Sequence, residues 1–331
     1  MTLMAKSFGI ELYFFTAQDI HPEDKTVDAV LIEGNTRKPK TISLPIIIYN
    51  DEDSYTDKAA KEVRPLIKKE CYLVRNGIVS TKQKIYDILN ADGRFKKYLI
   101  ETHIVETFER FLELFESYNR DVILKPEDGM QGAGIVRITF NATEYVISSN
   151  EKKFLFKNID ELKDYWNKYF IQRKYILQPY IVSRTKYGNP FDIRLHAHRG
   201  AQGKFCLIPY PRIGRNPKGI LSNLSAGGYI TSLHKFLQQE YGDKWEMVHH
   251  KLMYLGYNFP DYFQSLFKKR IQAMAIDVGI ERIGDLYELK IFEVQSIGPG
   301  TGFLEKEVSV MNMEYLRYLG ECLANGTLNN E

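Results

Sequence analysis

The chain has 331 residues, of which 44% are hydrophobic and 26% are charged. These fractions are typical of a globular protein with a large core, and the length predicts two or three domains. The net charge of +3 is small and the basic residues are not gathered in one block, so the composition argues against a nucleic-acid-binding protein.

The cysteines and the hydropathy pattern indicate the cellular compartment in which the protein is expected. Cys71, Cys206 and Cys322 are far apart and odd in number, so they form neither a disulfide framework nor a zinc-ligand spacing. No apolar stretch approaches the roughly 20 residues of a membrane span. The N-terminus lacks the long apolar core of a signal peptide. We therefore expect a cytoplasmic protein that does not contact membranes.

Residues 1–75 are predicted to form a small β-rich domain. Its strand candidates, chosen for alternating or continuous apolar residues, are 8–15, 27–33 and 45–49. Asn50, Asp51 and Asp53 either face a substrate or form a solvated loop, and the solvated loop is favoured.

Two helices are predicted after this domain. Ser80 and Thr81 are candidate caps for an amphipathic helix that begins at Lys82 and ends at Asp92 and Gly93. The second helix is predicted to follow Thr102, because apolar residues recur at helical spacing from there onward. A lysine at the start of a helix is ordinarily solvated, and the helix alone gives Lys82 no other role.

A glycine-rich hairpin is predicted at residues 122–138, VILKPEDGMQGAGIVRI. Apolar strands flank a turn that contains Gly129, Gln131, Gly132 and Gly134. Because glycines carry no side chain, backbone N–H groups at such a turn can approach phosphate oxygens, and Lys125 would add a positive charge. The glycine spacing alone leaves two interpretations open, a flexible turn and a phosphate-binding hairpin.

The strand predicted at 191–198, FDIRLHAH, carries polar residues on one face. Alternation places Asp192, Arg194, His196 and His198 together. This face is either part of a site or a solvent-exposed sheet surface. The two histidines lack an evident third ligand, so metal binding by them is not predicted.

The C-terminal third is predicted to contain helices at 233–255 and 262–275, strands at 276–280 and 286–294, and a final helix at 305–323. A turn at 283–285 would let the two strands pair antiparallel and bring Asp277 toward Glu293. Glu293 and Gln295 share one face of the second strand. Two carboxylates this close repel each other unless a cation lies between them.

Taken in order, the segments KPEDGMQGAGI, QPYI, DIRL, SNLSAGG and FEVQS resemble the ATP-grasp superfamily, in particular its YheC/YheD endospore coat-associated branch. They are also similar to RimK-type and glutathione-synthetase-like ligases. The resemblance covers about residues 77–323. It implies an α+β fold, in which two α+β subdomains grip ATP after an N-terminal β-rich α/β domain. The implied domains are 1–75, 76–180 with the glycine hairpin as a lid, and 181–331 with the metal site.

The resemblance also implies roles for individual residues. Those expected to bind the nucleotide are Lys82, Lys125, Gly129, Gln131, Gly132, Gly134, Gln178, Tyr180, Ile181 and Asp192. Among these, the 178–181 segment would be the hinge beside adenine, and Asp192 would lie near the ribose. Arg194, Arg212 and Asn223 would face the γ-phosphate or an acyl phosphate. Asp277, Glu293 and Gln295 would hold Mg²⁺.

The implied activity is that of a ligase that uses ATP and Mg²⁺ and passes through an acyl phosphate, releasing ADP and phosphate. Its partners would be a small-molecule or peptide carboxylate and an amine or thiol, with no nucleic acid and no membrane; a homodimer stays open. A small-molecule kinase and a nucleotide-binding, spore-coat-associated protein without turnover are the alternatives. Gln295 stands where the family usually has Asn, and Leu221 stands where RimK-type enzymes carry a basic residue.

Overall fold

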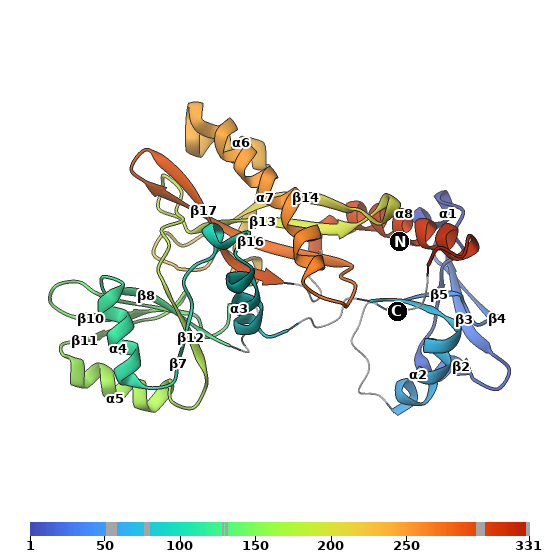
Figure 1. The fold of residues 1–331 in the computed structure, drawn as a ribbon, viewed down its shortest axis with the longest axis horizontal. Coiled ribbons are helices and arrows are strands. Elements are labelled where there is room, and N and C mark those ends of the chain that lie inside the picture. The colour runs from blue at the N-terminus through green and yellow to red at the C-terminus, as the bar shows by residue number, and fades with distance from the viewer. Residues whose placement is uncertain (51–57, 76–79, 128, 130–131, 296–301, 329–331) are drawn as a thin grey trace.

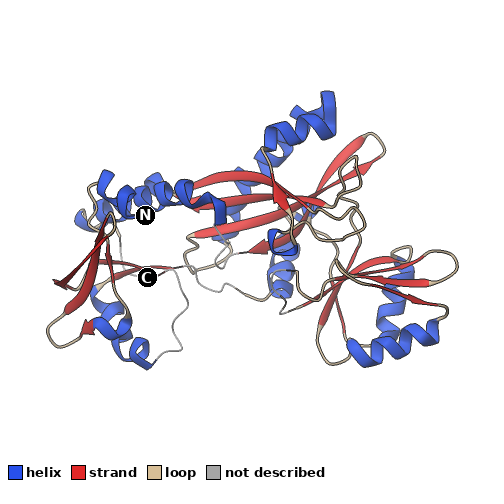
Figure 2. Cartoon of the chain, turned by 180° about the vertical axis from the view of Figure 1, so that it is seen from behind, coloured by secondary structure: helices blue, strands red, loops and turns tan. Residues whose placement is uncertain are grey.

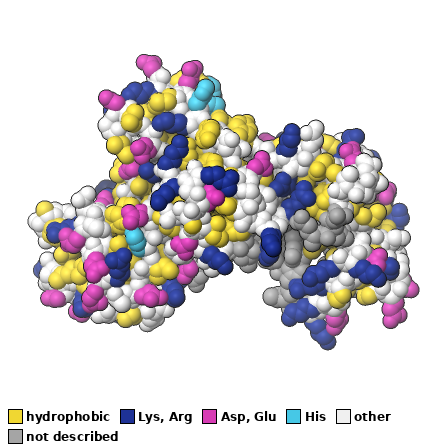
Figure 3. Space-filling view, viewed as in Figure 1, with side chains coloured by type: hydrophobic (Ala, Val, Ile, Leu, Met, Phe, Trp, Pro, Cys, Tyr) yellow, Lys and Arg dark blue, Asp and Glu magenta, His cyan; other side chains and the backbone are white. Residues whose placement is uncertain are grey.

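The computed structural model describes residues 1–50, 58–75, 80–127, 129, 132–295 and 302–328. Asp51, Asp53 and Gln131, which were singled out above, lie outside the described residues. The molecule is elongated, with a small N-terminal sheet at one end, a six-stranded sheet at the other and a five-stranded sheet between them (Figure 1). Acidic, basic and hydrophobic side chains are interspersed over the face drawn in Figure 3.

The N-terminal region is β-rich, as predicted, but it also contains helices. Its elements are α1 (Thr2–Ser7), β1 (Tyr13–Phe14), β2 (Ile20–His21), β3 (Thr26–Glu33), β4 (Thr36–Ser43), β5 (Ile47–Asn50), α2 (Lys58–Glu70) and β6 (Tyr72–Arg75). The strand predicted at 8–15 is wrong except for β1. Helix α2 was not predicted, although Val63, Leu66 and Ile67 follow helical spacing and pack on the core of this sheet.

The six-stranded sheet is antiparallel, in the order β11-β10-β9-β8-β12-β7. Its strands are β7 (His103–Val105), β8 (Asp121–Pro126), β9 (Val136–Phe140), β10 (Tyr145–Ser148), β11 (Lys153–Phe156) and β12 (Tyr175–Pro179). Helices α4 (Phe108–Ser117) and α5 (Ile159–Tyr169) lie against this sheet (Figure 2). The core between them is rich in aromatic side chains. The helix predicted directly after Thr102 is wrong at its start, because residues 103–105 pair with β12 and Thr107 caps α4.

The five-stranded sheet is also antiparallel, in the order β15-β14-β13-β16-β17. Its strands are β13 (Phe191–Arg199), β14 (Phe205–Ile213), β15 (Tyr229–Ile230), β16 (Ala273–Ile283) and β17 (Leu286–Gln295). The surrounding helices are α3 (Lys82–Asp92), α6 (Leu233–Tyr241), α7 (Trp245–Ser265) and α8 (Glu305–Ala324).

Two helix predictions in this region are wrong in part. The helix predicted at 233–255 is interrupted by a 3-10 turn at Gly242–Lys244, and the one predicted at 262–275 ends at Ser265. Ala273 is the first residue of strand β16, because the backbone there pairs with the buried strand β13. No described helix has the length and apolar character needed to span a membrane.

The two faces of β13 are both covered. Ile193 and Leu195 lie in the core beneath α7, whereas the alternate residues face the cavity described below and helix α8. Every residue of β13 is buried, so the exposed-sheet interpretation of its polar face is wrong. In the described part of the chain, no group of three or more His, Cys, Asp or Glu side chains is placed to hold a metal ion.

Candidate active site

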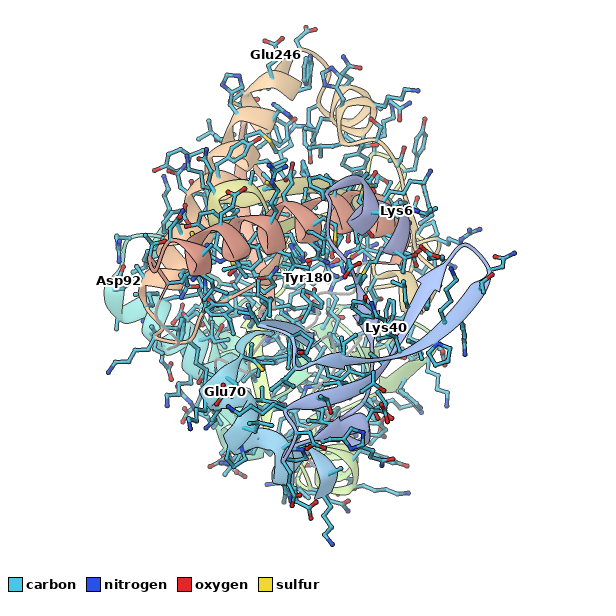
Figure 4. All side chains as sticks on the ribbon, turned by 90° about the vertical axis from the view of Figure 1, so that its right-hand side faces the viewer. Lys6, Lys40, Glu70, Asp92, Tyr180 and Glu246 are labelled. Atoms are coloured by element: carbon cyan, nitrogen blue, oxygen red, sulfur yellow. The ribbon has the colours of Figure 1, made fainter. Side chains whose placement is uncertain are left out.

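A cavity of about 680 Å³ lies between the six-stranded and five-stranded sheets. Side chains that are distant in sequence meet in it, from Lys82 at the start of α3 to Gln295 at the end of β17. It is lined by fourteen of the residues that the sequence nominated, namely Lys82, Lys125, Gly129, Gly132, Gln178, Tyr180, Ile181, Asp192, Arg194, Arg212, Asn223, Asp277, Glu293 and Gln295. Tyr180 lies near the centre of the molecule in Figure 4.

The glycine hairpin contacts the loop that contains Leu221 and Asn223, on the five-stranded side of the cavity. Strands β8 and β9 pair antiparallel on either side of the turn, as predicted. Gly132 has a φ of +79°, and a Cβ there would come within 3.0 Å of Leu221 and 3.2 Å of the Asn223 amide nitrogen. Gly134 does not line the cavity and packs against Pro126. A side chain at Gly132 would therefore separate the hairpin from the loop beneath it.

Lys82 ties this hairpin to the five-stranded sheet. Its Nζ donates a hydrogen bond to the Gly129 carbonyl at 2.6 Å and lies 3.0 Å from a carboxylate oxygen of Glu293. The Thr81 hydroxyl caps α3 by accepting from the Lys84 N–H, which fixes the start of the helix. The solvated-lysine interpretation of Lys82 is therefore wrong, since its side chain is only 29% exposed.

Lys125, at the end of β8, points across the cavity to β17. Its Nζ donates to the Phe292 carbonyl at 3.3 Å. Burial lowers the pKa of Lys125 to about 8, although the nearby Glu293 carboxylate acts in the opposite direction. The ammonium group is therefore a partly desolvated charge that an anion would stabilise.

The segment from Gln178 to Ile181 leads from the six-stranded sheet to the five-stranded sheet, where a hinge was predicted. The Gln178 side chain donates to the Thr102 hydroxyl at 2.8 Å. The Tyr180 ring lies 3.6 Å from the guanidinium carbon of Arg137, and its hydroxyl accepts from Arg184. Several contacts thus fix the orientation of this segment at the edge of the cavity.

Asp192 is part of a buried ion pair. Its two carboxylate oxygens accept hydrogen bonds of 2.7 Å from Arg212, and one of them also accepts from the Ser222 hydroxyl at 2.6 Å. These contacts orient Arg212 toward the cavity. The ribose contact predicted for Asp192 stays a prediction.

Asp277 joins the two arginines. Arg194 donates to its carboxylate at 2.8 and 2.9 Å, and Arg212 lies 2.8 Å from the same group. Burial alone would raise the pKa of Asp277, but the two guanidinium groups lower it to about 2. The carboxylate therefore stays ionised and holds both arginines in place.

Glu293 lies directly opposite Asp277, so the predicted antiparallel pairing of β16 and β17 is confirmed. A β-bulge at this point gives β17 one extra residue, Phe292. Gln295 is on the same face as Glu293, and its amide is 3.4 Å from that carboxylate. Arg194 also donates to the Gln295 carbonyl oxygen at 3.2 Å. Lysine and arginine side chains thus supply the positive charge that the paired carboxylates require.

The donor atoms here fit a hard cation. Mg²⁺ prefers carboxylate and amide oxygens, and Glu293 and Gln295 bring one group of each kind to the cavity. The Gln295 oxygen accepts from Arg194, and its amide nitrogen faces Glu293. Asp277 lies opposite Glu293, but its oxygens already accept hydrogen bonds from two arginines. Glu293 and Gln295 also have partners, Lys82 and Arg194 respectively, so the metal roles of all three residues stay predictions.

Several lining residues were not nominated from the sequence. They include Thr102, Tyr210, Ser222, Leu224, Phe292 and Phe303. Ser222 lies in the loop that contains Asn223, so its place next to a nominated residue was the available signal. Thr102 carried no signal, because its contact with Gln178 depends on the pairing of β7 with β12.

The fold and the site define a class. Two α+β units enclose a cavity lined by two lysines, a glycine hairpin and facing acidic residues, which is the arrangement of an ATP-grasp protein. The chain belongs to the YheC/D like ATP-grasp family, whose model matches residues 72–319, about three quarters of the sequence. The predicted family and α+β fold class are thereby confirmed.

Two curated relatives come from Bacillus subtilis (strain 168). The chain is 28% identical to the endospore coat-associated protein YheC over 235 residues, which cover 67% of this chain and 64% of YheC. It is 23% identical to the endospore coat-associated protein YheD over 331 residues, covering 93% of this chain and 70% of YheD. The chain thus spans less than two thirds of the length of YheC. Among solved structures, the ATP-grasp ligase PsnB complexed with minimal precursor is similar, with a TM-score of 0.47 and 12% identity. The match covers 95% of this chain and 92% of the PsnB chain.

Proposed function

We propose that this protein is a ligase that uses ATP and Mg²⁺ to join a carboxylate to an amine or a thiol. The observation that carries the proposal is the convergence of two lysines, two arginines and an oxygen-donor pair on one cavity in a chain of the ATP-grasp family. In such a reaction a carboxylate takes the terminal phosphoryl group of ATP and ADP leaves. The amine or thiol then displaces phosphate from the acyl phosphate.

The side chains fit the electrostatic demands of phosphoryl transfer, which needs alignment and charge neutralisation more than covalent chemistry. Lys82 and Lys125 would bind phosphate oxygens, and the backbone of the glycine hairpin would cover them. Arg194 and Arg212 are already oriented by Asp277 and Asp192. Because their positions are fixed beforehand, they can stabilise developing negative charge with little reorganisation.

Glu293 and Gln295 would hold Mg²⁺. The bound ion would neutralise charge on the phosphates during transfer. Glu293 now pairs with Lys82, and this pair would rearrange when the metal binds. We place Asp277 beside the metal rather than on it. Its role there would be to hold Arg194 and Arg212 in position.

A second candidate is a nucleotide-binding protein without turnover that associates with the spore. It is favoured by the names of the two curated relatives, both endospore coat-associated proteins, and by the two arginines that hold Asp277. A small-molecule kinase is the third candidate, and it would differ only in its stable phosphorylated product.

The test is phosphate release from ATP and Mg²⁺ in the presence of pooled carboxylic acids and amines. Release that requires both an acid and an amine supports the ligase. A stable phosphorylated product supports the kinase, and nucleotide binding with no product supports the second candidate. Glu307→Gln is a matched control for Glu293→Gln, because it removes an exposed carboxylate on α8 away from the cavity.

A further inference from the structure

Resting on this proposed function, we propose that the acid substrate is a monocarboxylate with an apolar body. We assign the recognition of that body to Leu221, Leu224 and Phe303, three apolar side chains that line the same cavity as the two arginines. The carboxylate would be held at Arg194 and Arg212.

Two of these three apolar side chains are exposed to solvent. Leu224 is 41% exposed and Phe303 is 44% exposed, yet both line the cavity. Large apolar side chains that are exposed inside a cavity are typical of a ligand surface. The surface is also firmly supported, because Phe303 packs edge-on against Tyr210 at 4.9 Å and Tyr210 is buried against Leu304 and Val308.

This apolar surface adjoins the two arginines. Tyr210 lies directly opposite Arg194 in the pairing of β13 with β14. Leu221 precedes Ser222, whose hydroxyl donates to Asp192, the partner of Arg212. A carboxylate at the guanidinium groups would therefore place the rest of its molecule against the leucines and Phe303.

The charges of the cavity limit the number of carboxylates. Among the described lining side chains, the positive groups are Lys82, Lys125, Arg194 and Arg212, and the negative groups are Asp192, Asp277 and Glu293. Both arginines are paired with aspartates, and Lys82 is paired with Glu293. The positive groups outnumber the negative groups by one, so the described lining can neutralise one added carboxylate and leaves a second without a counter-charge. Burying an unpaired carboxylate is costly.

Calorimetric titration of three acids tests the proposal. Acetate, hexanoate and adipate are titrated into the protein, with and without Mg²⁺ and a nonhydrolysable ATP analogue. Hexanoate has the apolar body that acetate lacks, and adipate adds a second carboxylate at the same chain length. We expect hexanoate to bind at least about tenfold tighter than either, given the typical gain per buried methylene. Equal or tighter binding of acetate or adipate, or no binding of hexanoate at millimolar concentration, would overturn the proposal.

Two leucine variants make the test specific to this surface. Leu224→Arg places a positive charge beside the apolar surface and should reverse the preference between hexanoate and adipate. Leu286→Arg is the control, because Leu286 is 59% exposed at the far end of β17 and does not line the cavity. An unchanged preference in Leu224→Arg, or the same change in both variants, would contradict the assignment. A separate nucleotide titration distinguishes the proposals: absent nucleotide binding counts against the ligase, while acid binding without nucleotide still decides the substrate class.

Discussion

Lys125 offers a sensitive test of the phosphate site, because its charge depends on pH near neutrality. Burial lowers the pKa of Lys125 to about 8, so the ammonium group is mostly charged at about pH 7 and mostly neutral at about pH 9. The protonated fraction falls about tenfold over this interval. If Lys125 must be charged to bind phosphate, the affinity for ADP should fall about tenfold, which corresponds to about 1.4 kcal/mol.

Isothermal calorimetry of ADP binding across this pH range measures the effect. The second ionisation of a phosphate group has a pKa of about 6, so the ligand is mostly ionised at about pH 7 and contributes little to the slope above it. Lys125→Arg should bind with little pH dependence, because a guanidinium stays charged. Lys125→Ala should weaken binding by about 1.5–3 kcal/mol, the usual range for a hydrogen bond to a charged group, whereas Lys84→Ala on the exposed face of α3 should not. A pH-independent affinity in the wild type, or the same slope in Lys125→Arg, would refute the reasoning.

Three further predictions concern the proposed metal ligands, a buried histidine and the bulge. Glu293→Gln should abolish turnover with an unchanged circular dichroism spectrum, and Gln295→Asn should retain activity; full turnover in Glu293→Gln would exclude the metal role. Burial lowers the pKa of His196 to about 3, so the unfolded state gains the proton first below about pH 6.5 and unfolding should become easier by about 2 kcal/mol at about pH 5. Denaturant titrations of His196→Phe should lack this acid-dependent loss of stability. Gly279→Ala should destabilise the protein by about 1–3 kcal/mol in the same assay, because a Cβ would collide with the Phe292 ring; unchanged stability would contradict this.

The sequence predicted local features of the fold better than the elements that depend on partners. The glycine hairpin and the pair of strands β16 and β17 were predicted, because each is set by a nearby turn and by alternation. Strand β7 was missed, because three residues carry no pattern of their own and become a strand only through β12. The same reason explains why Ala273 was wrongly assigned to a helix. Its pairing with β13 makes it part of a strand, in spite of the helical spacing of the residues before it.

The candidate site shows a similar division. The sequence indicated that Asp277, Glu293 and Gln295 would meet, since one hairpin brings them together. It did not indicate that Asp277 is held by two arginines, or that Lys82 reaches Glu293, because those contacts join residues that are at least 65 positions apart in the sequence. It also could not locate the β-bulge. Phe292 is the extra residue of this bulge, and its backbone carbonyl is the group that Lys125 contacts. Pairings between distant strands decide such details.

The distribution of the site over both sheets has a thermodynamic consequence. Lys125 and the glycine hairpin come from the six-stranded side of the cavity, whereas Lys82 on α3 and Glu293 on β17 come from the five-stranded side, so neither sheet alone contains a complete binding site. A nucleotide would then bind only when both sheets are folded and in contact, and its binding free energy would be added to the stability of each. At a concentration one hundred times its dissociation constant, this added stability is about 2.7 kcal/mol. Hydrogen exchange in the six-stranded sheet would thus slow when a ligand contacts Glu293 on the other side, which makes the nucleotide a link between the unfolding of the two units.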